Sequence, residues 1–163
     1  MTDFFNKTDL SRNDAEKIIS ETLNNCDDGE LYLENSKSES IVLDDDKIKS
    51  STYSSDLGYG LRAVTGEVVA YSHSNEISRN SLKQSADNLS STLKSRKGVY
   101  NHEIPKTNEK FYKNINPIEE KSLQSKLELL KEVNNYTRAK GGIVQQVTAS
   151  FSGEHKSIEI IRS

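Results

Sequence analysis

The chain has few cysteines, which could form disulfides, and few prolines, which end helices and strands. Among its 163 residues are one cysteine, two prolines, one methionine and no tryptophan. The lone cysteine, Cys26, cannot form an internal disulfide, which favours a reducing compartment. The longest apolar run, residues 68–71, is far shorter than the about 20 residues that span a bilayer. No basic and apolar leader opens the sequence. We therefore expect a soluble, cytoplasmic protein.

Hydrophobic residues and basic charge are also scarce. The hydrophobic fraction is 33% and the mean hydropathy is -0.75, which predicts one folded domain with a thin core. Lysine and arginine total 22 against 25 acidic residues, and no long basic run occurs. Because nucleic-acid binding needs clustered cations to neutralise phosphates, this balance argues against direct contact with DNA.

The first half of the chain predicts a helix followed by a meander of strands. Ser11 and Asp14 resemble a capping box before apolar residues at helical spacing. Alternating residues then predict strands at about 31–43, 48–54, 58–64 and 68–71, and the acidic run of Asp44, Asp45 and Asp46 is typical of a hairpin turn.

The second half predicts two helices and two strands. Ser78 caps a helix that ends at Gly98, a loop covers about 97–116, and Asn116-Pro117 starts a third helix that Gly141-Gly142 ends. The expected buried residues of this third helix are Leu123, Leu127, Leu130 and Val133. A strand follows at 147–151, turns at Gly153-Glu154 and returns through Ile158 and Ile160. The fold class is α+β, with a mixed, largely antiparallel sheet of about six strands and three helices packed on it. The final strand has an open edge, so we expect further sequence to cover it.

No catalytic or metal-binding constellation emerges from the motifs. His102-Glu103 begins an H-E-x-x-H pattern, but Lys106 and Thr107 stand where the second histidine would fall. His73 and His155 also lack ligand spacing, so all three histidines are interpreted as surface or loop residues.

The remaining candidates have ordinary structural interpretations. Gly58-Tyr59-Gly60 lacks the third glycine and the helix of a dinucleotide loop. Residues 91–94 fit S-x-x-K without its companion motifs. Asp44–Asp46 lacks the glycine and glutamate of a calcium loop, and Cys26 has no nearby histidine. The sequence therefore predicts no catalytic residue and no metal ligand, and it leaves substrate-binding residues unassigned.

A family resemblance does emerge from the order of several segments. GELYLENSKSESIVLDDDKIKSS, GYGLRAVTGE and VAYSHSNEIS are followed by a helix, by PIEEKSLQSKLELLKEV and by VQQVTASFSGEHKSIEIIRS. Together these segments resemble the amino-terminal domain of the TldD/PmbA family, on the TldD branch. The most specific parts are Gly58-x-Gly60-x-Arg62 with Gly66-Glu67, and the strand that begins at Gln146.

The resemblance implies a zinc metallopeptidase that degrades unfolded peptides together with a PmbA (TldE) partner. The family has also been described as a modulator of DNA gyrase. Its zinc ligands, an H-E-x-x-x-H motif and a cysteine, lie in the carboxy-terminal half. We therefore expect residues 1–163 to form a non-catalytic amino-terminal domain that is inactive alone and holds no zinc, with the catalytic domain missing from this sequence.

Two other functions stay open at this stage. A free-standing module could bind peptides or a partner without cleavage, and an H-E-x-x-x-H motif encoded after residue 163 would argue against it. A regulator of gyrase or DNA is the third alternative, which the acidic balance disfavours. Within the resemblance, we expect the sheet at 30–64 to help wall a substrate chamber. Arg62 is expected to form a structural salt bridge, with substrate carboxylate binding as its alternative role.

Overall fold

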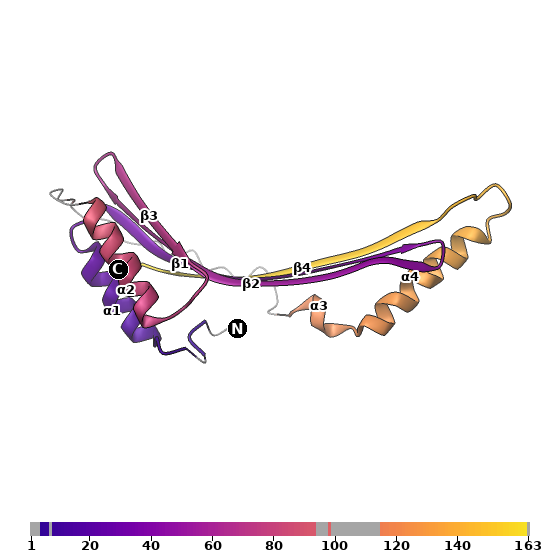
Figure 1. The fold of residues 1–163 in the computed structure, drawn as a ribbon, viewed down its shortest axis with the longest axis horizontal. Coiled ribbons are helices and arrows are strands. Elements are labelled where there is room, and N and C mark those ends of the chain that lie inside the picture. Colours follow the sequence, from indigo (N-terminus) through magenta and orange to yellow (C-terminus); the bar gives the residue numbers. More distant parts are fainter. Residues whose placement is uncertain (1–3, 7, 94–97, 99–114, 163) are drawn as a thin grey trace. The chain divides into compact units, whose positions relative to one another are not determined.

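A computed structural model describes residues 4–6, 8–93, 98 and 115–162 (Figure 1). The elements are, in chain order, α1 (Arg12–Leu23), β1 (Asp28–Asp44), β2 (Lys47–Thr65), β3 (Val68–Ser74), α2 (Arg79–Thr92), α3 (Pro117–Glu120), α4 (Leu123–Arg138) and β4 (Thr148–Ile161). None of the described helices combines the length and apolar character needed to cross a bilayer.

The strands form one sheet in the order β3-β2-β1-β4. A two-residue turn joins β1 to β2, and both of its residues have positive φ, 44° at Asp45 and 63° at Asp46. This is the backbone of a type I′ turn, whose twist matches that of antiparallel strands. β3 runs antiparallel to β2 over the pairs from Tyr59↔Ser74 to Thr65↔Val68.

The chain divides into two compact units. The first unit comprises the described residues within 1–35, 56–112 and 157–163, and the second comprises those within 36–55 and 113–156. In the first unit, α1 and α2 pack on one face of the sheet. Their side chains share a core with β1, β2 and β3 that includes Ile19, Leu33, Leu61, Leu82 and Leu89.

The second unit has a smaller core. Ile41 and Leu43 of β1 pack with Leu130 of α4 and Ala149 of β4, and Leu127 and Phe151 lie partly buried against them. This core contains few apolar side chains, as the low hydropathy of the sequence predicts.

The prediction of about six strands is wrong, because the structure has four among the described residues. Two pairs of predicted strands are continuous: residues 48–54 and 58–64 both lie in β2, and 147–151 and 158–160 both lie in β4. The turn predicted at Gly153-Glu154 does not form, and Gly153 has no positive φ. A Cβ at Gly58 would lie 2.8 Å from the carbonyl oxygen of Ser74, so this glycine permits close approach of β3.

The prediction of three helices is also wrong among the described residues. Ser11 and Ser78 cap α1 and α2 as predicted, but the third predicted helix is two. Asn116 caps the short α3, and Lys121 is extended at φ −114°, ψ 138°. Ser122 then caps α4 by accepting a hydrogen bond from the backbone of Ser125. A second cap inside one apolar pattern therefore restarts the helix. α2 ends at Thr92, before Gly98, and most of the predicted loop lies outside the described residues.

The buried face of α4 differs from the predicted one and is partly polar. Leu123 and Val133 are 54% and 44% exposed, whereas Lys126, Leu130 and Asn134 are buried. The Lys126 ammonium forms an ion pair with Glu39 of β1 and donates a hydrogen bond to the carbonyl oxygen of Ile118 at 2.6 Å. The side chain of Lys126 is 5% exposed and that of Glu39 is 11% exposed. The ion pair of Lys126 and Glu39 is therefore buried at a position where two apolar side chains could pack instead.

Asn134, the other buried polar residue of α4, contacts the turn between β1 and β2. Its amide donates a hydrogen bond to Asp46 Oδ1 at 2.7 Å, and Arg138 forms an ion pair with Asp45. The backbone of Val147 also donates to Asp45 Oδ1 at 2.9 Å. These contacts hold two aspartates in a backbone conformation that ordinarily favours glycine.

Replacement of Lys126 by Ala is expected to destabilise the second unit by about 3–5 kcal/mol, because it leaves the Glu39 carboxylate buried without its cation. Lys126→Met combined with Glu39→Leu should recover most of that loss. Urea unfolding followed by circular dichroism measures both effects. Lys131→Ala, on the exposed side of α4, is the matched control, and an equal loss in this control would contradict the assignment.

Candidate functional site: the polar face of the first unit

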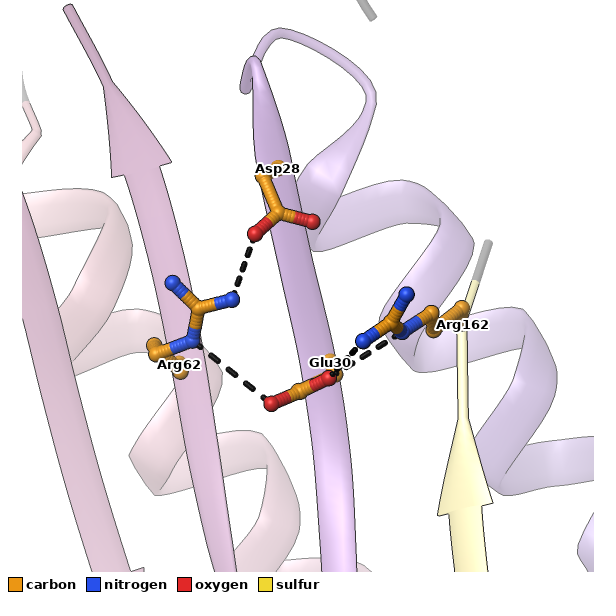
Figure 2. A network of polar contacts seen from close by, with 4 residues as sticks. All are labelled: Asp28, Glu30, Arg62 and Arg162. Atoms are coloured by element: carbon orange, nitrogen blue, oxygen red, sulfur yellow. Dashed lines mark hydrogen bonds and ion pairs between the residues drawn. The ribbon is translucent and has the colours of Figure 1, made fainter. Parts of the chain in front are cut away.

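In the first unit, the sheet has a polar face opposite α1 and α2. We define this polar face by Asp28, Glu30, Tyr32 and Glu34 of β1 with Arg62 of β2 and Tyr71 of β3. These β1 residues alternate with buried Leu31 and Leu33. Since successive side chains of a strand point to opposite sides, the leucines enter the core and the polar residues lie away from it. Figure 2 looks onto this face, with the helices behind the sheet.

A chain of charges crosses the polar face from β2 to the end of β4 (Figure 2). Arg62 forms an ion pair with Asp28 and approaches Glu30, with 3.6 Å between Nε and Oε1. Arg162 donates two hydrogen bonds to Glu30 Oε2, at 3.0 Å from Nε and 2.7 Å from Nη2. The predicted structural salt bridge of Arg62 is confirmed, and its partners come from a neighbouring strand.

The network stabilises the ionised form of Asp28. The hydrogen bond from Arg62 lowers the pKa of this carboxyl from its ordinary value of 3.8, against the opposing effect of partial burial. The side chains of Arg62 and Asp28 are 33% and 43% exposed, so water screens the attraction. The network therefore fixes side-chain positions more than it stabilises the fold.

A shallow hollow of about 430 Å³ lies on the same unit, where β3 leaves β2. Its lining consists of Tyr32, Glu34, Asp56, Leu57, Gly58, Tyr59, Gly60, Tyr71, Ser74 and Asn75. The lining holds three tyrosines and two carboxylates and no basic residue. An arrangement of aromatic rings and carboxylates attracts cations.

Two contacts shape the hollow. The Tyr71 ring lies over Gly60, where an added Cβ would come within 2.5 Å of the Tyr71 hydroxyl. The Tyr32 hydroxyl donates a hydrogen bond to Glu34 Oε2 at 2.5 Å. This bond, with smaller contributions from burial and nearby charge, raises the pKa of Tyr32 to about 12. Tyr32 therefore remains a neutral donor at physiological pH and holds Glu34 in place.

The residues considered as chemical candidates from sequence do not come together. His73 stacks on Tyr71 with 5.9 Å between ring centroids, His155 lies on β4, and His102 lies outside the described residues. Cys26 is buried beyond the end of α1. The Ser91 hydroxyl donates to the carbonyl oxygen of Asn88 in its own helix. Across the described ranges, no three His, Cys, Asp or Glu side chains gather to hold a metal ion.

The sequence did not predict the hollow. Tyr32, Glu34, Asp56 and Tyr71 belong to three strands, and no local spacing connects them. One usable signal was the alternation of Tyr32 and Glu34 with buried leucines, which places both polar side chains on one face. The Gly60-Tyr71 contact depends on the β2–β3 register and needs the structure.

Fold and face together define an α+β domain with helices on one side of an antiparallel sheet and a polar surface on the other. Residues 29–93 match the family model of PmbA/TldA metallopeptidase domain 1. The "Metalloprotease TldD homolog" of Buchnera aphidicola from Acyrthosiphon pisum is 35% identical over 81% of this chain and 28% of its own length. The protein of the same name from Haemophilus influenzae is 32% identical over 84% of this chain and 29% of its length.

Solved structures share the fold. A Thermotoga maritima protein described as a candidate modulator of DNA gyrase superposes with a TM-score of 0.69, at 14% identity, over 83% of this chain and 31% of its own. A Bacteroides thetaiotaomicron protein with a similar description gives 0.63, at 16% identity, over 93% and 37%. TldE from Thermococcus kodakarensis gives 0.56, at 13% identity, over 89% and 34%.

These matches confirm the resemblance: the chain belongs to the TldD/PmbA family and carries its amino-terminal domain. It spans less than a third of the length of the curated relatives it matches. The names of those relatives identify the family as one of metalloproteases.

Replacement of Arg62 by Gln should lower the free energy of unfolding by about 0.5–1 kcal/mol at pH 7, since the pairs are partly exposed. Because the folded pKa of Asp28 is depressed, this stabilisation exists above the unfolded pKa and disappears as the pH falls through the folded value. The difference from the parent chain should therefore shrink as the pH falls below the ordinary carboxyl value of 3.8 and vanish below the lower pKa of the folded state. Urea unfolding at several pH values checks this, and a difference that persists in acid would contradict it.

Proposed function

We propose that this chain is the non-catalytic amino-terminal domain of a TldD-like zinc metallopeptidase and helps to hold peptide substrates. In this proposal the sheet at residues 30–64 forms part of the wall of a substrate chamber. The zinc belongs to the carboxy-terminal domain, and a PmbA (TldE)-like subunit is the partner. Membership of a family of metalloproteases supports the general function, and the geometry of β2 supports the role of this domain.

The observation that carries the proposal is the one-sided pairing of β2. This strand has 19 residues, but β3 pairs with it only from Tyr59 to Thr65. Before Tyr59, within the described part of the chain, β2 has a neighbouring strand on the β1 side only. An extended peptide can add to such an edge through main-chain hydrogen bonds, which depend little on its sequence. This mode of binding suits unfolded substrates of varied sequence.

The composition of the β2 edge fits reversible binding. From Lys47 to Leu57 every residue is exposed, and the segment is rich in serine and threonine with lysines at 47 and 49. Charged and polar edges resist irreversible aggregation while leaving the backbone accessible. The described residues of this chain provide no ligand set that fits zinc, so no catalytic step is derived for them.

Main-chain pairing predicts a positional effect of N-methylation. In an added strand, alternate N–H groups face the sheet edge. A labelled heptapeptide of alternating Thr and Val should bind the chain, and N-methylation of one alternate set of residues should weaken binding more than tenfold. Methylation of the other set should leave the affinity nearly unchanged. Fluorescence anisotropy measures all three peptides, and equal effects of the two sets would reject edge pairing.

The 163-residue chain should contain far less than one zinc ion per molecule after purification in zinc-supplemented medium, and it should cleave no flexible peptide. The physical reason is that its described carboxylates, histidines and cysteine do not converge on one point. Elemental analysis and a casein cleavage assay test this. One tightly bound zinc per chain would overturn the assignment of a non-catalytic domain.

A further inference from the structure

We propose that the outer side of α4 is an interface at which a second copy of this chain docks, with the two α4 helices antiparallel. We define the α4 stripe as Leu129, Val133 and Tyr136, which all belong to the second unit. This interface is separate from the peptide-holding role and from the PmbA-like partner of the proposed function, so either proposal can fail without the other.

The first argument is that α4 exposes large apolar side chains while it buries polar ones. Leu129, Val133 and Tyr136 are 49%, 44% and 67% exposed. Lys126 and Asn134, in contrast, are 5% and 0% exposed. A helix that packs on one sheet and otherwise faces water normally has its apolar residues toward the core and its polar residues outside. The outer side of α4 thus has the composition of an interface rather than that of a solvated surface.

The second argument is the spacing of these side chains. The members of the α4 stripe follow one another at intervals of four and three residues. This spacing places them in one line along the helix. The same intervals separate the apolar residues of helices that pack against each other in pairs. A single line of this kind fits one partner helix rather than a broad surface.

The third argument is that the charges beside the α4 stripe complement those of a second copy. Glu128 and Glu132 are exposed near Leu129, at the beginning of the stripe. Lys140 lies at the other end, with its Nζ 4.0 Å from the centroid of the Tyr136 ring. When two α4 helices run antiparallel, the lysine of each copy lies beside the glutamates of the other. A parallel arrangement would place like charges side by side, so the antiparallel one is favoured.

The antiparallel arrangement also lets the α4 stripe pair with itself. With the two-fold axis between them, Val133 of each copy lies opposite Tyr136 of the other. Leu129 then lies opposite the methylene groups of Lys140, which can cover an apolar side chain while the ammonium stays in water. Each contact occurs twice, as in the isologous interfaces of two-fold dimers. Because the stripe is short, we expect a weak dimer that dissociates on dilution.

Sedimentation velocity of the 163-residue chain over a range of concentrations tests this interface. The sedimentation coefficient should rise with concentration toward the value of a dimer. Leu129→Gln combined with Tyr136→Gln should weaken the dimer by roughly tenfold or more, because apolar contacts at its centre are lost. Both side chains are exposed, so the variant should keep the circular dichroism of the parent chain.

Leu123→Gln is the matched control. Leu123 is 54% exposed, but it precedes Leu130 by seven residues and therefore lies on the side of α4 that faces the core. This variant removes exposed apolar surface from the same helix and should leave the dimer affinity unchanged. A parent chain that stays monomeric at every concentration would refute the interface, as would an equal loss in the control.

Charge exchange tests the antiparallel arrangement. Glu128→Lys combined with Glu132→Lys should weaken the dimer, since the new lysines face Lys140 of the other copy. Adding Lys140→Glu to this variant should restore the affinity, and high salt should reduce both effects. A third substitution that restores nothing would refute the antiparallel pairing.

Disulfide formation provides a measurement that does not depend on affinity. A mixture of Val133→Cys and Tyr136→Cys chains, one of them with a tag that changes its size, should form a mixed disulfide on oxidation. Each variant alone should form much less, and the native Cys26 is buried. Non-reducing electrophoresis separates the products. An equal or greater yield from either variant alone would overturn the proposed pairing.

Discussion

The structure depends on β1 burying alternate side chains in two separate cores. This strand lies between β2 and β4 in the sheet order. Leu31 and Leu33 enter the core of the first unit, and Ile41 and Leu43 enter that of the second. A shift of register by one residue would expose all four of these side chains and bury their polar neighbours. The register of β1 therefore determines both cores and the composition of the polar face.

The small number of apolar residues explains the buried polar contacts. α4 faces its core with Lys126 and Asn134 on either side of Leu130. The lysine reaches both a carboxylate and a carbonyl oxygen, and the asparagine reaches the hairpin turn. Such contacts add little net stability compared with apolar packing, but they are costly to leave incomplete. They therefore define the position of α4 where few hydrophobic contacts can do so.

Helix caps and the hairpin turn could be predicted from the sequence, whereas the full lengths of the strands and of the third helix could not. Ser11, Ser78 and Asn116 cap helices as expected, and Asp45 and Asp46 form the predicted turn. The errors arose where a local signal had two meanings. Residues 55–57 were interpreted as a break between two strands and Gly153-Glu154 as a turn, whereas both segments lie within long strands. Ser122 was one polar residue in an apolar pattern, and its role as a second cap required the extended backbone of Lys121.

The candidate site was less predictable than the fold, since its residues come from separate strands. The salt bridge of Arg62 followed from a lone charge in a glycine-rich strand, but its partners Asp28 and Glu30 depend on strand pairing. The placement of Tyr71 beside Gly60 depends on the β2–β3 register in the same way. Sequence patterns within one strand identify which face a residue occupies, and only the sheet identifies its neighbours.

The ionic character of the polar face keeps an exposed sheet surface from being apolar. An apolar sheet surface of this kind would attract other chains without selection. Partly exposed ion pairs stabilise the fold by only about 0–1 kcal/mol each, so rearranging them costs little free energy. On the opposite face, the buried leucines of β1 keep the strands in register. The ion pairs of the polar face can therefore rearrange without a change in the register of the sheet.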